Sequence, residues 1–263
     1  MSTDIFDGLQ RLGLCAPRDA LEALVTHATK SRLAPSQLLE QLVALERRQR
    51  DARNLAARTK RATLGTTMPL DRFDWAFPRA IDRPLYDQLL TLAFAKKGHN
   101  ILFRGPSGVG KTTLAQNIGM RALESGKTIR FATLNGVLAD LLVQESLPAV
   151  ERRLRRYTSP DILFLDELGY LPCDARSGDM LYNIINRRHG KASTVITTNL
   201  AFKEWGAVFP GAACVVALVD RFTENCHVFE IDGDSWRQRD QSAVSVSAPA
   251  PPMRRPNKRK RSR

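Results

Sequence analysis

The sequence lacks paired cysteines. The four cysteines are Cys15, Cys173, Cys214 and Cys226. They are scattered without any C-x-x-C spacing, which argues against a zinc site and fits reduced thiols in the cytosol. The four histidines are equally isolated, because none has a cysteine or a second histidine at ligand spacing. We therefore expect a cytoplasmic protein in which no histidine has a metal-binding or acid–base role.

Long hydrophobic runs are missing as well. A membrane-spanning helix needs about 20 consecutive apolar residues, and the longest candidate, at 214–219, is far shorter. The first residues include Asp4 and Asp7 and contain no basic segment followed by an apolar one, which argues against a secretory signal. The sequence therefore predicts a soluble protein with no membrane-spanning segment.

Acidic residues are scarce relative to basic ones. The chain has 40 Lys and Arg residues and 27 Asp and Glu residues, which gives a formal net charge of +13. Seven of the basic residues lie at 254–263, where there is no acid, so the rest of the chain carries +6. A basic surface favours nucleic acid or an anionic membrane as a partner. The segment from 242 onward has Ser, Ala and Pro before its basic residues and no aromatic residue, so we expect a disordered tail that contacts nucleic acid only through phosphates.

One stretch of the chain, 100–118, carries a nucleotide-binding motif. It reads NILFRGPSGVGKTTLAQNI, and its centre matches the phosphate-binding pattern G-x-x-x-x-G-K-[ST] without a mismatch. The apolar residues 101–103 predict a buried strand, and Leu114, Ala115 and Ile118 recur at helical spacing after the glycine turn. A strand, a glycine turn and a helix N-terminus direct backbone N–H groups at one spot, which suits a polyphosphate.

The sequence therefore predicts that this loop binds the phosphates of a nucleotide. Lys111 can reach the β- and γ-phosphates, and the Thr112 hydroxyl can ligate Mg²⁺. The predicted contacts are Gly105, Pro106, Ser107, Gly108, Val109, Gly110, Lys111, Thr112 and Thr113. A chance match is the alternative, and the strand and the helix on the correct sides argue against it.

Two adjacent acids follow a second apolar strand, in the segment 161–169 that reads DILFLDELG. In a parallel sheet we expect this strand to lie beside the one that feeds the phosphate loop, so that its carboxylates emerge next to the γ-phosphate. Asp166 is then placed to hold Mg²⁺, and Glu167 to orient and deprotonate the attacking water. A further strand within 192–200 has Asn199 at its polar end, which can contact the γ-phosphate or the water, or cap the following turn.

Residues 1–65 predict an all-helical N-terminal domain. A helix that opens near 35–36 continues into a very basic run at 47–61, where arginines spaced by three or four residues form one ridge. A second arginine cluster lies on one arc of a helix predicted within 134–158. Each face can contact the DNA backbone, and a solvated helix face is the alternative for each. The candidate DNA-binding residues are Arg47, Arg50, Arg58, Arg61, Arg152, Arg155 and Arg156.

Residues 66–83 predict a linker that ends in a docking segment. Its apolar residues, Leu70, Phe73, Trp75 and Phe77, are too numerous for a free tether, so we expect them to pack against the next domain. A segment directly before a nucleotide fold often helps to bury the adenine, and ordinary core packing is the alternative. The predicted units are a helical domain at 1–65, the linker at 66–83, a nucleotide-hydrolysing domain at 84–240 and a disordered basic tail at 241–263.

Together these segments resemble the IstB-like transposition helper ATPases, a family close to the DnaC-type helicase loaders within the AAA+ group. The likeness covers residues 5–240. It is carried by GPSGVGKTTLA at 105–115, ILFLDELGYLP at 162–172, TTNL at 197–200 and DRFTENCHVFEIDGDSWR at 220–237. The basic helical N-terminus and the segment at 70–74 also look like that family. One position departs from the pattern: many members have His where this chain has Thr113, which leaves phosphate binding intact but weakens any role for the side chain there.

The resemblance implies an α/β fold of the P-loop AAA+ type, in which helices sandwich a five-stranded parallel sheet. It implies an ATPase that uses ATP and Mg²⁺, assembles as a homo-oligomer on duplex DNA, hydrolyses ATP in the assembled state and helps a transposase. It also implies a helical element facing the DNA, here at 134–158. By the same match Arg221 resembles the arginine finger that reaches a neighbour's γ-phosphate, with an ion pair to Asp220 or Glu224 as the alternative. Arg237 sits where a second arginine senses nucleotide.

Three functions are compatible with these residues. The first is a DNA-assembled ATPase that recruits a transposase, and the second is a replicative helicase loader whose N-terminal domain grips a helicase ring. The third is a DNA-binding scaffold in which nucleotide is only structural, and Glu167 argues against it because a scaffold needs no water-activating carboxylate. The basic run at 47–61 favours DNA over a helicase as partner. No guanine-reading N-K-x-D string is present, and the preference for adenine rests on the family resemblance.

Overall fold

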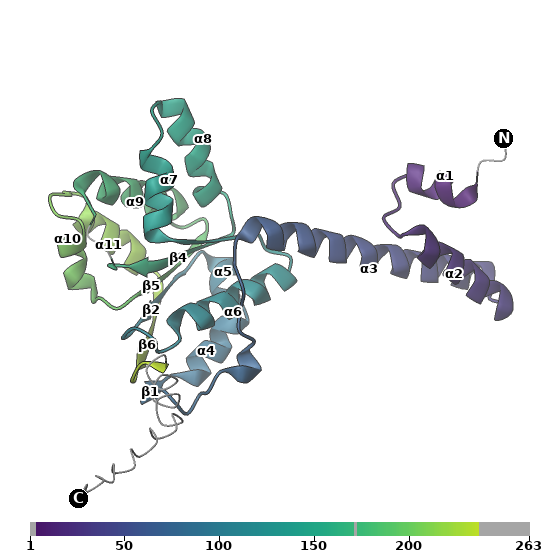
Figure 1. Ribbon diagram of the computed structural model, residues 1–263, viewed down its shortest axis with the longest axis horizontal. Helices are drawn as coiled ribbons and strands as arrows, with labels where there is room; N and C mark the ends of the chain where they lie inside the picture. The colour runs from purple at the N-terminus through teal and green to yellow at the C-terminus, as the bar shows by residue number, and fades with distance from the viewer. Residues whose placement is uncertain (1–3, 171–172, 237–263) are drawn as a thin grey trace, which may run out of the picture.

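The centre of the fold is a six-stranded sheet. The computed structural model describes residues 4–170 and 173–236. The strand order is β1-β6-β2-β5-β4-β3; five strands are parallel, and the short β1 runs antiparallel to β6 (Figure 1). The strands are β1 (Ala80–Ile81), β2 (Asn100–Arg104), β3 (Ile129–Thr133), β4 (Ile162–Leu168), β5 (Ser193–Thr198) and β6 (Cys226–Asp232).

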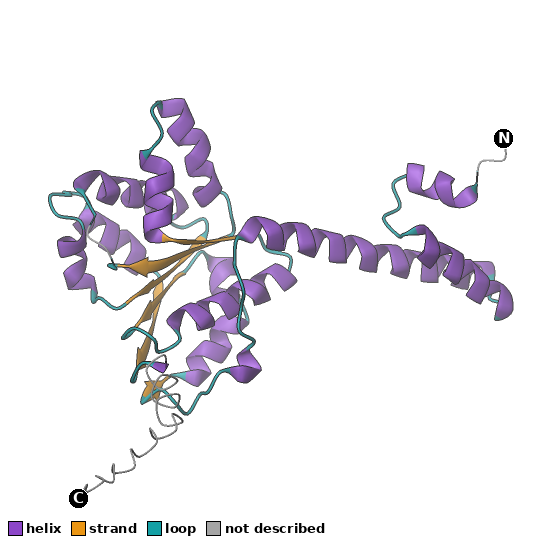
Figure 2. Cartoon of the chain, in the orientation of Figure 1, coloured by secondary structure: helices purple, strands orange, loops and turns teal. Residues whose placement is uncertain are grey.

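Helices cover both faces of the sheet (Figure 2), because successive side chains of a strand point to opposite faces. On β2, Ile101 and Phe103 pack on one side and Leu102 on the other. The first side is covered by α4 (Arg83–Leu90), α5 (Ala93–Lys97) and α6 (Lys111–Glu124). The second is covered by α7 (Leu134–Leu142), α8 (Leu147–Thr158), α9 (Ala175–Arg188), α10 (Trp205–Val208) and α11 (Val215–Thr223). Burial on both faces explains the continuous apolar runs of the central strands.

The sheet confirms the predicted parallel strands and corrects two details. It is mixed, because the chain ahead of α4 runs along the free edge of β6 and pairs Ala80 with Asp232. The prediction that the strand ending in the two acids lies beside the one feeding the phosphate loop is wrong, since β5 lies between β4 and β2. All residues of β5 are buried, as an interior position requires, whereas β3 at the edge is only partly buried.

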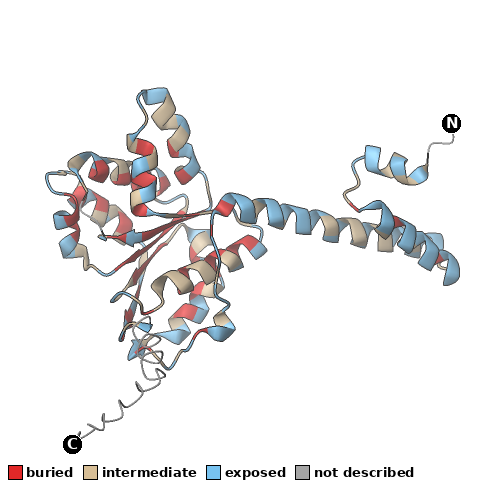
Figure 3. Cartoon of the chain, viewed as in Figure 1, coloured by how far each residue is buried: buried red, intermediate tan, exposed pale blue. Residues whose placement is uncertain are grey.

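The N-terminal helices form an arm that projects from the sheet (Figure 1). Its long element is α3 (Pro35–Ala62). The helix α2 (Arg18–Lys30) folds back against the first part of α3, and α1 (Ile5–Arg11) contacts α2. Figure 3 shows that most of this arm is exposed. Among the described residues that precede Ala62, the buried hydrophobic side chains are Ala16, Leu21 and Ala28. The arm therefore has a small core, and polar contacts fix much of the arrangement of its helices.

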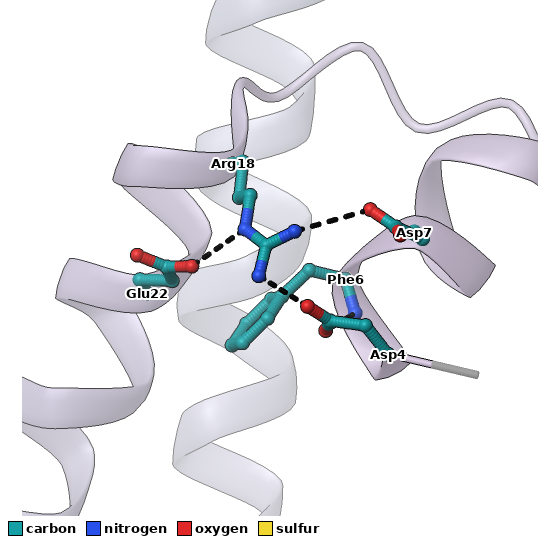
Figure 4. A network of polar contacts seen from close by, with 5 residues as sticks. All are labelled: Asp4, Phe6, Asp7, Arg18 and Glu22. Carbon is teal, nitrogen blue, oxygen red and sulfur yellow. Dashed lines mark hydrogen bonds and ion pairs between the residues drawn. The ribbon is translucent and has the colours of Figure 1, made fainter. Parts of the chain in front are cut away.

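Arg18 and its three acidic partners join the first two helices of the arm. Its guanidinium contacts Asp4, lies 3.2 Å from Asp7 and donates at 2.7 Å to Glu22 one turn further along α2 (Figure 4). These side chains are a third to a half exposed, so solvent screens each pair and its contribution to stability is small. The network therefore orients α1 more than it stabilises the arm.

Glu46 anchors the turn between α1 and α2 to α3. Its carboxylate accepts hydrogen bonds from the backbone N–H groups of Cys15 at 2.8 Å and Ala16 at 2.9 Å, and from Arg50 Nε at 2.5 Å. Burial works against the charged form, but these donors outweigh it and lower the pKa of Glu46 to about 2. The carboxylate is therefore charged wherever the arm is folded under ordinary conditions.

The base of the arm is fixed to the sheet and to α6. Thr63, which ends α3 in the left-handed conformation (φ 52°), donates to the Phe131 carbonyl on β3 at 2.6 Å. Arg58 Nη2 donates to the Leu123 carbonyl at the end of α6 at 3.2 Å. Gln116, on the same helix, donates to the Leu64 carbonyl at 3.0 Å. The arm is thus attached to the helix whose other end forms the phosphate loop.

Candidate nucleotide-binding site

The phosphate loop joins β2 to α6, as the motif predicts. Gly108 and Gly110 have positive φ angles of 83° and 96°, which lets the loop turn back before Lys111 opens α6. Lys111 Nζ donates to the carbonyls of Gly105 at 2.7 Å and Pro106 at 2.6 Å. The ammonium therefore lies within the loop, beside the N–H groups at the start of α6, where an anion is stabilised.

The first strand-end acid reaches the phosphate loop across the intervening strand. The Thr112 hydroxyl donates to the two Asp166 carboxylate oxygens at 3.0 and 3.1 Å, and Thr197 of β5 donates to the same carboxylate. Asp166 is only 6% exposed. A buried carboxylate and a hydroxyl at the start of α6 are hard oxygen donors of the kind that Mg²⁺ prefers, so the residues present fit this ion.

The second acid, Glu167, is turned toward the cavity by a local break in β4. Its φ is 64°, and the pairing with β5 shifts register between Leu165 and Leu168. Its backbone N–H donates to the Thr197 hydroxyl at 3.0 Å. The left-handed conformation therefore lets Asp166 face inward and Glu167 open into the cavity that is also lined by the phosphate loop and Asn199.

The other wall of the cavity comes from segments far apart in the chain. The lining residues here are Met68, Arg72, Phe73, Asp74, Phe77, Pro78 and Trp236. The rings of Phe77 and Trp236 meet edge to face with centroids 4.7 Å apart, and the backbone N–H of Trp236 donates to the Gly108 carbonyl at 3.1 Å. The docking segment thus contributes to the site, whereas Trp75 and the half-buried Leu70 pack against the core.

Two glycines of the loop allow this wall to close. A Cβ on Gly110 would lie 2.6 Å from the Phe73 ring, and a Cβ on Gly108 would lie 2.2 Å from Ser235 Oγ. Both contacts are too short for a real side chain. The glycines therefore serve the packing of residues 73 and 235 as well as the turn.

Sequence reasoning missed three residues that the fold brings to the site. Tyr170 lines the cavity, and its hydroxyl lies 3.0 Å from Ser107 Oγ on the phosphate loop. Thr197 binds Asp166, and Trp236 covers the loop. For Tyr170 the position just after the acids was an available signal, but neither of the other two had a spacing that pointed to the site.

Several predicted site residues lie outside the cavity. Arg221 is on α11, where its Nη1 donates to Asn186 Oδ1 instead of pairing with either neighbouring acid. Arg237 and the basic tail lie outside the described residues. All seven members of the two arginine groups are exposed except Arg58, which is half-buried. Arg50 pairs with an acid on its own helix, Arg58 donates to a backbone carbonyl of α6, and Arg156 pairs with an acid of α7.

The histidines lie away from the nucleotide cavity. The rings of His99 and His227 are 5.6 Å apart at the opposite end of the central strands, where burial, His99 and Lys97 lower the pKa of His227. His189 contacts Glu224. Within residues 4–170 and 173–236, no group of three or more His, Cys, Asp or Glu side chains is placed to hold a metal ion. No helix in these ranges is both long and apolar enough to cross a membrane.

The strand β5 lies between the phosphate-loop strand and the acidic strand, and a Thr–Asp contact lies beneath the loop. Together with the loop motif, these features define a P-loop nucleotide-binding protein. The family model described as IstB-like ATP binding protein matches residues 8–244. The chain belongs to this IstB-like family.

Relatives and solved structures agree with this assignment. The ATP-binding protein of insertion sequence IS21 from Pseudomonas aeruginosa is 32% identical over 226 residues, covering 86% of this chain and 85% of that protein. The ATP-binding protein of insertion sequence IS5376 from Geobacillus stearothermophilus is 31% identical over 241 residues, covering 92% and 96%. A crystal structure of DnaI matches with a TM-score of 0.51 and 16% identity, covering 65% of this chain and 90% of that chain, which shows a shared fold.

Proposed function

We propose that this chain is a Mg²⁺-dependent ATPase that assembles on duplex DNA and brings a transposase to it. The observation that carries the ATPase part is the buried Thr112–Asp166 contact beneath the phosphate loop, with Glu167 on the rim of the same cavity. Relatives named as ATP-binding proteins of insertion sequences support the transposition part. The basic composition supports DNA as the surface on which the protein assembles.

Each of these cavity residues would have a separate role in ATP binding and hydrolysis. Thr112 and Asp166 would hold Mg²⁺, which supplies charge neutralisation at the β- and γ-phosphates when bound. Lys111 would exchange its two carbonyl partners for phosphate oxygens. Glu167 would orient the attacking water and accept its proton, and Asn199 would hydrogen-bond the water or the γ-phosphate. Phe77 and Trp236, on the far wall, would contact the base.

Arg221 is the residue that would make hydrolysis depend on assembly. This residue lies on α11 and does not line the cavity of its own copy, which supports a role toward the nucleotide of a neighbouring copy. An arginine supplied in trans stabilises the charge that develops on the transferred phosphoryl group. Hydrolysis would therefore depend on the homo-oligomer, and DNA would stimulate hydrolysis by gathering copies. The exposed Arg152 and Arg155 on α8 would contact the phosphates of the duplex.

The substitution Glu167→Gln tests the hydrolytic part. We expect the variant to bind ATP with unchanged affinity, to form persistent DNA-bound oligomers and to lose turnover by about 10²- to 10⁴-fold, because the water loses its base. ATP affinity, turnover and sedimentation with duplex DNA are the measurements. The matched control is Glu145→Gln, an exposed acid of the α7–α8 loop. Wild-type turnover in Glu167→Gln would remove the role given to Glu167.

A replicative helicase loader is the second candidate. The observation that favours it is the exposed arm, on which Leu39 and Val43 are 60% and 57% exposed and lie one turn apart on α3. Such side chains suit a protein partner better than DNA. If the arm binds a helicase, replacing Leu39 and Val43 with Ser should leave DNA-stimulated ATP hydrolysis intact. A purified transposase of the same element that binds only the ATP- and DNA-loaded protein supports the first candidate.

A further inference from the structure

Arg221 is held by two uncharged groups of α9. Its Nη1 donates to Asn186 Oδ1, and its guanidinium carbon lies 5.8 Å from the centroid of the Tyr182 ring. Asn186 and Tyr182 are one turn apart on α9, which packs directly against α11 (Figure 1). An amide oxygen and a ring face fix the direction of the guanidinium without neutralising its charge.

The acids closest to Arg221 in the chain are Asp220 and Glu224. Glu224, which follows the last residue of α11, lies 2.6 Å from His189 Nε2. Among the ion pairs of the described residues, none joins Arg221 to Glu224 or to Asp220. Asn186, in the last turn of α9, therefore contacts Arg221, and His189, which directly follows α9, contacts Glu224.

We propose that Asn186 and Tyr182 are positioning residues for Arg221, and that they hold it charged and extended for the γ-phosphate of a neighbouring copy. This inference rests on the proposed function, in which Arg221 acts in trans. A guanidinium has five donors, and the bond to Asn186 uses one of its nitrogens, which leaves Nη2 and Nε for phosphate oxygens. An arginine paired with a carboxylate would have to break that pair before it could reach the nucleotide.

The alternative is that the Asn186–Arg221 contact merely joins α9 to α11. The two possibilities differ in what a carboxylate at position 186 does. If the contact is only structural, Asn186→Asp strengthens it and leaves turnover unchanged. If Asn186 positions a catalytic charge, the new carboxylate neutralises Arg221, and turnover falls while nucleotide binding stays the same.

The test measures steady-state ATP hydrolysis by the full chain on saturating duplex DNA, at a protein concentration where assembly is complete. We expect Asn186→Asp to lower kcat by about 10- to 100-fold with little change in KM for ATP, in DNA affinity or in Tm, because only transition-state charge is lost. The control is Asn183→Asp, the same change one turn earlier on α9, where Asn183 accepts from Arg187 Nε at 2.8 Å. Tyr182→Phe should retain most of kcat, and Tyr182→Leu should lower it.

A second pair of variants keeps the test decisive if Asn186→Asp fails to fold. His189→Ala frees Glu224 to pair with Arg221 and should lower kcat, and Glu224→Gln in that background should restore it. Arg221→Ala removes the guanidinium and should give the lowest kcat of these variants. If Arg221→Ala abolishes hydrolysis but neither Asn186→Asp nor His189→Ala differs from Asn183→Asp, the positioning role is wrong and the finger stands. If Arg221→Ala hydrolyses ATP normally, the trans arginine of the proposed function fails, and the positioning role fails with it.

Discussion

Arg188 provides the most direct test of how the sheet is tied to the helices around the site. Its side chain is 1% exposed and donates to five backbone carbonyls and the Thr194 hydroxyl. Those carbonyls belong to Tyr157, Thr158, Pro160, Asp161 and Ser193, at 2.5–3.4 Å. One guanidinium therefore joins the end of α8, the start of β4 and β5. Burial lowers the pKa of Arg188 to about 10, so the group stays charged at neutral pH.

The expected cost of Arg188→Met follows from these contacts. Methionine fills much of the volume of the arginine side chain. It also removes the cost of burying a charge, which offsets part of the lost stability. The carbonyls of Pro160 and Ser193, which have the shortest arginine contacts at 2.8 and 2.5 Å, lose these donors, and each buried acceptor left unsatisfied costs about 1–3 kcal/mol. We expect a net loss of about 3–5 kcal/mol in the free energy of unfolding, a large part of the stability of an ordinary domain.

Urea denaturation followed by circular dichroism measures this loss. The control is the neighbouring Arg187→Met, because Arg187 is 39% exposed and pairs with Glu151 at the surface, where such a pair contributes about 0–1 kcal/mol. A loss for Arg188→Met no larger than that for Arg187→Met would refute the reasoning. It would mean that the carbonyls find other donors, such as water, once the guanidinium is gone.

Three further predictions concern the arm, the DNA surface and the nucleotide. The lowered pKa of Glu46 stabilises the fold above about pH 4.5, and this stability is lost as the pH falls toward 2; Glu46→Gln should remove that part of the acid dependence of the helical signal. Replacing Arg152 and Arg155 with Ala should reduce the slope of log K against log salt for duplex DNA by about 2, and an unchanged slope means that α8 is only solvated. Trp236→Ala should raise KM for ATP by about 10-fold with kcat retained, because it removes contact with the base alone; an unchanged KM in titrations of hydrolysis places the base elsewhere.

The local elements around the nucleotide were accessible from the sequence. The strand, glycine turn and helix at 100–118 each have a pattern that depends only on neighbouring residues, and the structure has β2, the loop and α6 in these places. The acids at 166 and 167 were assigned on the same basis. The assignment placed them at the correct edge of the sheet even though the expected strand neighbour was wrong, because all parallel strands end at that edge.

The contacts between distant segments could not be predicted in this way. Trp236 reaches the phosphate loop only because β6 lies beside β2 and delivers the chain to it. Arg221 and Asn186 have ordinary helical surroundings in the sequence, and their pairing depends on how α9 and α11 pack. Helical spacing from Leu181 and Ile184 puts Arg188 on the buried face of α9, but only the packing of that helix brings its guanidinium to the carbonyls that it binds.

By itself the sequence determined where the phosphate loop and the strand-end acids lie, because each needs a fixed order of residues within one short stretch. The tertiary structure decided which strand separates the loop from the acids, which aromatic residues line the far wall of the cavity, and which partners hold the arginine of α11. These are decided by packing, since burying both faces of the sheet selects one arrangement of strands and helices and so brings together residues that are far apart in the chain.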